Sequence, residues 1–250
     1  MYHFFVEPDQ IGEDMISVTG SDVNHIRNVL RMKPGETVLI SSRTGGDYLC
    51  EAECFLAEQV EFKILEMRES GMELPARIHL FQGLPKGDKM ELIIQKAVEL
   101  GAYRIIPVET KRTVVRLDAK KEEAKKKRWN AISESAAKQS KRSLVPEVSG
   151  VMTFQEALKE AERYGLKLIP YECADGILET RAQIAKAEAG MDIAVFIGPE
   201  GGFEETEIEE AKKAGIAPIT LGKRILRTET AGLCILSALM LQLEEKETRG

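Results

Sequence analysis

The sequence predicts an α/β protein in which a small β-barrel precedes a larger domain built on a parallel sheet. The main observation is a change of pattern near residue 70. Before it, short β-favouring runs alternate with turn signals, which is typical of a small, mostly antiparallel barrel. After it, apolar strands alternate with helical patterns, which is typical of a parallel sheet with helices on both faces. We therefore expect two domains, residues 1–70 and residues 75–250, joined by the short segment ESGMELPAR.

The expected barrel contains one helix among its strands. The strands are expected at the runs HFFVE, MISVTG, ETVLISS, DYLCEAECFL and VEFKILEM, and turn residues such as Lys33-Pro34-Gly35 separate them. The exception is the run from Asp22 to Arg31 (DVNHIRNVLR), which favours a helix with Asp22 as its N-cap.

The larger domain is expected to alternate strands and helices from the run RIHLFQG onward. A helix follows that strand: Asp88 is its expected N-cap, Glu91 stands three residues later at the capping-box position, and Gly101 ends it. Later strands are expected at residues 104–109, 166–172, 192–198 and 217–222, and later helices at residues 120–141, 154–164, 180–189, 204–214 and 230–245.

The final helix is apolar nearly all round between Ala231 and Leu241, with only Ser237 interrupting. A helix of that kind must be buried on several sides. The core of its own domain could supply this cover. A terminal helix is normally peripheral, however, which favours a dimer interface.

Charge is divided unevenly along a chain whose net charge is -6. Residues 1–70 hold 6 Lys and Arg against 13 Asp and Glu, residues 71–150 hold 17 against 10, and residues 151–250 hold 12 against 18. The acidic balance argues against a general polyanion binder, whereas the basic middle suits a local phosphate-contacting surface. By itself, the run KKEEAKKKR (120–128) is read more simply as a solvated helix face laced with charge pairs.

Several classes of protein are disfavoured by what the sequence lacks. The N-terminus has no basic segment followed by an apolar stretch, and no apolar run approaches the roughly 20 residues that span a bilayer, so we expect a cytoplasmic protein. The 4 cysteines form no C-x-x-C pair and only 3 histidines are present. We therefore expect no metal site, and we interpret the cysteines as buried thiols.

A glycine-rich turn, Gly198-Pro199-Glu200-Gly201-Gly202, follows the strand expected at 192–198. Ligands of open α/β sheets bind beyond the carboxyl ends of the strands, and glycine lets a ligand approach the backbone closely. The turn matches neither G-x-G-x-x-G nor G-x-x-x-x-G-K-[ST], and the carboxylates of Glu204, Glu205 and Glu207 would repel a phosphate from the next helix. A rigid turn without a ligand explains this feature alone equally well.

Two neighbouring strand ends favour a ligand site over a rigid turn without a ligand. The run GKRILRTETAG (222–232) follows the strand at 217–222, and Pro170-Tyr171-Glu172 ends the strand at 166–172. Three successive strand ends would line a single crevice. Such a crevice suits a flat base held by main-chain hydrogen bonds and apolar contact, without a phosphate site.

Two motifs together, IGPEGGF (197–203) and LGKRILRTETA (221–231), resemble the C-terminal signature of the SPOUT class of RNA methyltransferases. More narrowly, the chain is similar to the RsmE family, the 16S ribosomal RNA uridine-N3 methyltransferases. Further blocks extend the likeness over essentially the whole chain: LPKGDKMELIIQKAVELGAYRIIPVETKRTVVR (84–116), RW…ESAAKQSKR…VP (128–146) and H-x-x-x-V-L-R (25–31). One departure is His3, because the family often has an arginine in the first few residues.

The resemblance implies a PUA-like N-terminal barrel and a SPOUT-like domain with a C-terminal trefoil knot. It also implies S-adenosylmethionine as methyl donor, a homodimer, and a uridine of small-subunit ribosomal RNA as substrate. Carried over by motif, the cofactor contacts are Gly198, Glu200, Gly201, Gly202, Leu221, Gly222, Ile225, Leu226, Arg227, Thr230 and Ala231. With that substrate, the expected RNA contacts are His25, Arg27, Arg31, Arg112, Arg116, Arg128, Lys138, Lys141 and Arg142, although a structural role explains His25 equally well.

The side chains of the second motif suit this chemistry. A sulfonium methyl is already electrophilic, so the enzyme mainly aligns it with the nucleophile and excludes water. Uracil N3 must lose its proton, and a guanidinium stabilises the resulting anion because it donates in a planar fork and stays charged. We expect Arg227 in this role and Glu229 as proton acceptor or as the group that orients Arg227. A local ion pair between the two explains Glu229 equally well.

The sequence leaves other functional classes open. A non-catalytic RNA-binding assembly factor would use Arg227 and the glycine loops for RNA alone. A nucleotide-dependent oxidoreductase is disfavoured by the missing G-x-G-x-x-G. Ribose 2′-O methylation of transfer RNA is the nearest competitor among methyltransferases, and only the family blocks disfavour it.

Overall fold

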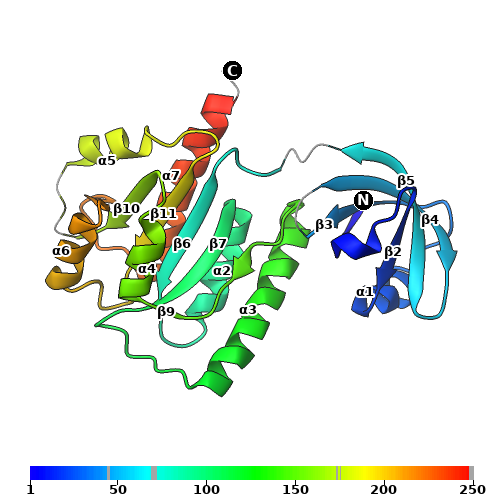
Figure 1. The fold of residues 1–250 in the computed structure, drawn as a ribbon, viewed down its shortest axis with the longest axis horizontal. Helices are drawn as coiled ribbons and strands as arrows, with labels where there is room; N and C mark the ends of the chain where they lie inside the picture. Colours follow the sequence, from blue (N-terminus) through cyan, green and yellow to red (C-terminus); the bar gives the residue numbers. More distant parts are fainter. Residues whose placement is uncertain (44–45, 69–71, 173, 175, 248–250) are drawn as a thin grey trace. The chain divides into compact units, whose positions relative to one another are not determined.

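The computed structural model describes residues 1–43, 46–68, 72–172, 174 and 176–247. By their contacts they form two units: Met1–Glu73 with Ala137–Val145, and Leu74–Ala136 with Pro146–Gly250 (Figure 1). Residues 69–71 of the expected linker, and Cys173, lie outside the described residues.

The first unit is built on a 5-stranded sheet with the order β1-β3-β4-β5-β2. All neighbouring strands are antiparallel except β1 and β3. This confirms the expected mostly antiparallel architecture. Alternate strand residues, among them Val38, Ile40, Val60 and Phe62, form its buried core. The strands are β1 (Tyr2–Val6), β2 (Met15–Thr19), β3 (Thr37–Ser42), β4 (Asp47–Phe55) and β5 (Gln59–Arg68), with the 3-10 turn η1 (Pro8–Gln10) after β1.

The helix expected to start at Asp22 is divided and begins one residue earlier. It consists of α1 (Ser21–Asn24) and the π-helical turn η2 (His25–Val29). The N-cap position belongs to Gly20, so the expected cap was wrong. The carboxylate of Asp22 instead pairs with Lys138 Nζ at 3.0 Å. A long-range ion pair therefore replaces the local cap.

The segment Ala137–Val145 is held in the first unit by buried polar contacts. Glu73 is the anchor, because its carboxylate accepts hydrogen bonds from the Arg142 guanidinium and from the backbone N–H groups of Ser143 and Leu144, at 3.0 and 3.1 Å. Arg142 is only 3 % exposed. A guanidinium buried and paired to this extent is part of the fold, since removing its partner would leave an uncompensated charge.

The second unit contains a 7-stranded sheet whose order is β12-β10-β11-β6-β7-β8, with β9 also paired to β7. All its pairings are parallel, which confirms the expected fold class. β11 shows why: all but the first residue of DIAVFI are buried, as expected of a strand covered on both faces. The strands are β6 (Arg77–Gly83), β7 (Ala102–Glu109), β8 (Glu147–Val148), β9 (Met152–Thr153), β10 (Leu166–Pro170), β11 (Asp192–Ile197) and β12 (Ala217–Ile219).

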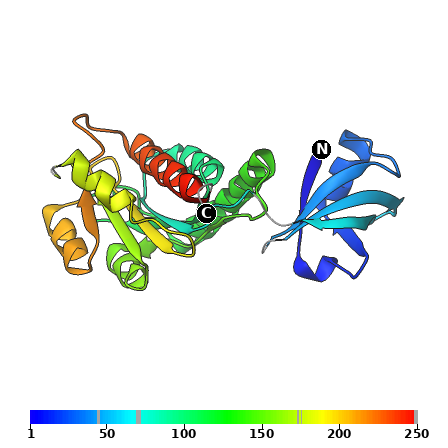
Figure 2. The same ribbon diagram turned by 90° about the horizontal axis from the view of Figure 1, so that it is seen from above.

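Helices cover both faces of this sheet, as Figure 2 shows. On one face, Phe154 and Leu158 of α4 and Ile208 of α6 pack against Phe81 and Phe196 of the strands. On the other face α2 and α7 pack side by side. The helices are α2 (Lys89–Glu99), α3 (Ala119–Ser140), α4 (Phe154–Ala161), α5 (Ile177–Ile184), α6 (Glu205–Lys213) and α7 (Thr228–Glu247).

The cysteines differ from expectation. Cys50 is buried, but Cys54 and Cys234 are exposed. The interpretation of all the cysteines as buried thiols was therefore wrong for these two. Cys234 lies on α7, whose apolar surface is wider than its own unit covers.

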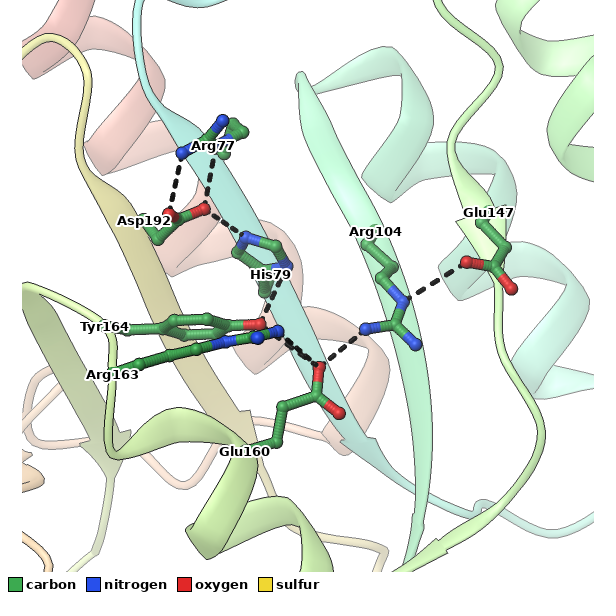
Figure 3. Close-up of polar contacts among 8 residues, drawn as sticks. All are labelled: Arg77, His79, Arg104, Glu147, Glu160, Arg163, Tyr164 and Asp192. Atoms are coloured by element: carbon green, nitrogen blue, oxygen red, sulfur yellow. Dashed lines mark hydrogen bonds and ion pairs between the residues drawn. The ribbon is translucent and has the colours of Figure 1, made fainter. Parts of the chain in front are cut away.

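A polar network lies at the amino-terminal ends of β6 and β11 (Figure 3). Arg77 donates two hydrogen bonds of 2.8 Å to Asp192, and His79 Nε2 contacts the same carboxylate at 2.8 Å. The His79 ring stacks on Tyr164 with 4.4 Å between centroids, and the Tyr164 hydroxyl donates to Glu160 at 3.2 Å. The network is completed by Arg104, Glu147 and Arg163.

Charge states follow from this packing. Burial lowers the pKa of His79 below its ordinary value of 6.5, and the hydrogen bond to Asp192 opposes this shift without reversing it. Burial would raise the pKa of Asp192, but the hydrogen bonds from Arg77 and His79 lower it overall. At neutral pH a neutral imidazole therefore donates its Nε2–H to an ionised carboxylate.

His79 should make the protein less stable in mild acid. The unfolded chain takes up a proton on this imidazole near pH 6.5, whereas the folded chain resists it, so the free energy of unfolding should fall as the pH drops below about 6.5. His3 contributes in the same direction, because burial lowers its pKa too. Urea unfolding between pH 7.5 and 5 should show a flatter profile for His79→Gln than for wild type. The exposed His25→Gln is the control, and equal profiles for both variants would contradict the assignment.

Arg142 should be required for stability. Arg142→Ala leaves the Glu73 carboxylate without its guanidinium partner, and we expect a loss of about 3 kcal/mol in the free energy of unfolding. The neighbouring Lys141→Ala removes one exposed positive charge and should cost less than about 0.5 kcal/mol. Chemical denaturation measures both, and similar small effects would show that the buried pair does not stabilise the first unit.

Candidate functional site

A cavity of about 370 Å³ opens at the carboxyl ends of β10, β11 and β12. Its walls are the three segments that follow these strands, as the order of the sheet requires. The lining residues are Lys89, Pro170, Tyr171, Glu172, Ile197, Gly198, Pro199, Glu200, Gly201, Gly202, Phe203, Thr220, Leu221, Gly222, Arg224, Ile225, Leu226, Arg227, Thr228 and Ala231.

The first wall is the glycine loop 198–203, whose shape depends on close packing. Gly202 has a φ of 66°, which favours glycine, and its N–H donates to the Pro199 carbonyl at 2.9 Å. A Cβ on Gly83 at the end of β6 would lie 2.6 Å from Pro199, so only glycine fits there. The Gly198 carbonyl accepts a hydrogen bond of 2.6 Å from Thr228 Oγ1. This loop is therefore fixed to β6 and to the start of α7.

Glu200 is held by a backbone N–H that precedes α2 and by the cationic side chain at the start of that helix. One carboxylate oxygen accepts from the Lys86 backbone N–H at 3.0 Å and from Lys89 Nζ at 2.7 Å. Burial opposes ionisation, but these hydrogen bonds and the Lys89 charge lower the pKa of Glu200 below its ordinary value. Its carboxylate is thus an ionised part of the loop's own support.

The second wall is the loop that follows β12. Gly222 has a φ of 108°, and Ile225 is 84 % exposed. Arg227 is exposed and lines the cavity, and its carbonyl accepts from the Ala231 N–H at 2.8 Å in the first turn of α7. A positive side chain therefore stands at the cavity wall with no carboxylate bound to it in the described part of the chain.

The cavity gathers all the expected cofactor residues except Thr230, which is exposed. Their assignment to a cofactor stays a prediction. Lys89, Thr228 and Arg224 line the cavity although the motifs did not predict them as cofactor contacts. Thr228 could have been found, because it lies inside the motif LGKRILRTETA and its hydroxyl is the natural partner of a carbonyl in the neighbouring loop.

Glu229 is placed differently from Arg227. It is not among the lining residues, and its Oε2 atom is buried without a hydrogen-bond partner in the described chain. No ion pair joins the described side chains of Arg227 and Glu229. The local ion pair considered from the sequence is therefore absent between these two side chains.

The expected RNA contacts fall into two groups. Three of them, His25, Arg31 and Lys141, are exposed in the first unit. The others already contact groups of the protein: Arg27 the carbonyl of Leu56, Arg112 that of Gly201, Arg116 Glu109, Arg128 Glu91, Lys138 Asp22, and Arg142 Glu73. A cation bound to a carboxylate has less charge to offer a phosphate.

Comparison with known proteins fits these observations. A family model described as an RNA methyltransferase domain matches residues 72–240, and one described as an RNA methyltransferase PUA domain matches residues 18–52. No helix in the described ranges has the length and apolar character needed to cross a membrane.

Individual relatives are similar over nearly their full length. The ribosomal RNA small subunit methyltransferase E of Bacillus subtilis (strain 168) is 38% identical, with 98% of each chain covered. That of Mesomycoplasma hyopneumoniae (strain 232) is 33% identical over 95% of this chain and 98% of the relative. A crystal structure of the Neisseria gonorrhoeae protein of the same name, bound to S-adenosyl methionine, is 32% identical with a TM-score of 0.84, and covers 96% of this chain and 97% of that one. The chain therefore belongs to the RNA methyltransferase family that includes the ribosomal RNA small subunit methyltransferases E.

Proposed function

We propose that this protein is an S-adenosylmethionine-dependent methyltransferase that methylates N3 of one uridine in small-subunit ribosomal RNA. The observation that carries the proposal is the cavity at the ends of β10, β11 and β12, because glycine loops form two of its walls. Similarity to a relative crystallised with S-adenosyl methionine supports the choice of cofactor. Ribosomal RNA as substrate makes the cytoplasm the expected compartment.

The residues of the cavity fit such a cofactor. Glycine backbone and apolar side chains such as Leu221 and Leu226 suit a flat adenine ring. Cationic and anionic side chains, among them Arg224 and Glu172, suit the charged methionine end. When bound, the cofactor supplies an electrophilic methyl group, and the walls of the cavity orient it and limit access of water.

Arg227 is the residue we assign to catalysis. Arg227 lines the cavity, and no carboxylate is paired with its side chain among the described residues. It can therefore donate to a uracil oxygen and stabilise negative charge as N3 loses its proton. Glu229 stays the proposed proton acceptor: its Oε2 atom is buried without a partner in the part of the chain described. Because Glu229 does not line the cavity, a proton would reach it through water.

A homodimer is part of the proposal. α7 buries Ile235, Leu236 and Leu239 in its own unit, yet Leu241 on the same helix is 63 % exposed and Leu92 on the adjacent α2 is 45 % exposed. Apolar surface on two packed helices supports contact with a second copy.

The first test is calorimetry with S-adenosylmethionine, combined with a methylation assay on small-subunit RNA. Wild type should bind the cofactor stoichiometrically and methylate the RNA.

Arg227→Ala should fold normally and lower kcat by about 10²–10³-fold, because it removes a stabiliser of developing charge. Lys223→Ala, an exposed neighbour that does not line the cavity, is the matched control. RNA binding without any cofactor binding would favour an assembly factor, and an Arg227→Ala protein of full activity would remove this residue from catalysis.

Arg31 offers a test of RNA contact by the first unit. Its φ of 51° is a conformation that favours glycine, so Arg31→Gly should leave the free energy of unfolding unchanged or raise it by up to about 1 kcal/mol. The same change removes an exposed positive charge and should weaken RNA binding and lower the dependence of log K on log salt by about one unit. Filter binding at several salt concentrations measures this. Unchanged affinity would exclude a phosphate contact at Arg31.

Leu241 offers a test of the homodimer. Wild type should sediment with twice the mass of the 27.8 kDa chain, and Leu241→Glu should shift it toward monomer because it places a charge in an apolar contact. Leu65→Glu, at an exposed leucine of the first unit, is the control and should stay dimeric. A wild-type monomer at micromolar concentration would contradict the dimer.

A further inference from the structure

We propose that Arg112 is a positioning residue for the cofactor loop, acting through the carbonyl of Gly201, and not primarily a contact to RNA phosphate. The inference rests on the proposed function, because it gives the 198–203 loop the role of holding the cofactor. It changes the interpretation of one basic residue that charge alone would assign to RNA.

The contact itself is direct. Arg112 Nη1 donates a hydrogen bond of 2.8 Å to the Gly201 carbonyl oxygen. A Cβ built on Gly201 would lie 3.2 Å from Cβ and 3.5 Å from Cδ of Arg112, so the aliphatic part of the arginine lies along the glycine backbone. Gly201 lines the cavity, whereas Arg112 does not. The arginine therefore contacts the loop without itself lining the cavity.

The segment that carries Arg112 is anchored independently. The Lys111 backbone N–H donates to Glu207 Oε1 at 2.9 Å, and the Glu204 N–H donates to Glu207 Oε2 at 2.8 Å. Glu207 is 1 % exposed, so this carboxylate is a buried junction between the segment after β7 and the start of α6. Thr113 Oγ1 also accepts from the Thr110 N–H at 2.9 Å, which fixes the turn. Arg112 thus projects from a rigid base.

The preceding residue of the loop is held in a comparable way. Glu200, next to Gly201, accepts from the Lys86 N–H and from Lys89 Nζ. Two neighbouring residues of the loop are therefore held by cationic side chains: Glu200 by Lys89 at the start of α2, and Gly201 by Arg112 after β7. These two contacts restrain the loop before the cofactor arrives, and this lowers the entropic cost of binding.

The geometry separates this role from a phosphate contact. A charge-assisted hydrogen bond to the Gly201 carbonyl uses one of the N–H donors of the guanidinium, which is then less available to a phosphate. If Arg112 mainly positions the loop, its removal should change cofactor affinity in the absence of RNA. If it mainly contacts phosphate, its removal should change RNA affinity and salt dependence and leave cofactor affinity unchanged.

The experiment compares wild type, Arg112→Ala, Arg112→Lys and Lys127→Ala in the full-length protein without RNA. Lys127 is exposed on α3 in the same basic section, so its variant controls for net charge. Titration calorimetry with S-adenosylhomocysteine should show about tenfold weaker binding for Arg112→Ala, partial recovery for Arg112→Lys, and wild-type affinity for Lys127→Ala. In methylation assays the KM for S-adenosylmethionine should rise while the KM for RNA stays near wild type.

A second measurement does not depend on the cofactor. Hydrogen exchange of the loop 198–203 should be faster in cofactor-free Arg112→Ala than in wild type, while the midpoint of global unfolding stays unchanged. Unchanged exchange together with unchanged cofactor affinity would overturn the proposal, as would a loss confined to RNA affinity. If wild type binds no S-adenosylhomocysteine, the proposed function fails, and the exchange of the loop still decides whether Arg112 positions it.

Discussion

The fixed conformation of the backbone at 198–203 is the constraint on which the candidate site depends. A glycine-rich turn is flexible in isolation, because glycine loses more conformational freedom on folding than other residues. Here donors from distant segments offset that loss: Thr228 binds the Gly198 carbonyl, Arg112 binds that of Gly201, and Lys89 binds the Glu200 side chain. The parallel sheet makes these contacts available, since it places the carboxyl ends of β6, β7 and β11 next to one another.

The two ends of the parallel strands in this sheet have different roles. At the carboxyl ends of the strands polar groups surround a cavity, whereas at the amino-terminal ends Arg77 and His79 both bind Asp192 (Figure 3). The residues at the amino-terminal ends satisfy buried charge within the fold. The lowered pKa of His79 therefore affects stability, whereas the chemistry proposed for this protein lies at the carboxyl ends of the strands.

Much of this could be predicted from the sequence, and the failures have a common cause. Alternating patterns located most long elements of the second unit, although α5 lies at Ile177–Ile184 instead of the expected 180–189. The three strand ends also predicted a crevice whose walls include Gly198, Gly222 and Arg227. Local sequence patterns could not predict which residue each charged side chain pairs with. Asp22 was expected to cap a helix and pairs with Lys138 instead, and Arg142 was expected on an RNA surface and lies buried on Glu73. These pairs join residues far apart in the chain, so no short stretch of sequence encodes them. For the same reason the return of Ala137–Val145 to the first unit has no local signature.

The most direct test of the whole account is to identify the methylated nucleoside. Small-subunit ribosomal RNA lacking the modification would be incubated with the protein and S-adenosylmethionine, digested to nucleosides, and analysed by mass spectrometry. The account predicts one 3-methyluridine per RNA molecule. A ribose-methylated nucleoside would contradict the assignment of N3 as the acceptor, and the absence of any new methyl group would contradict the proposed activity.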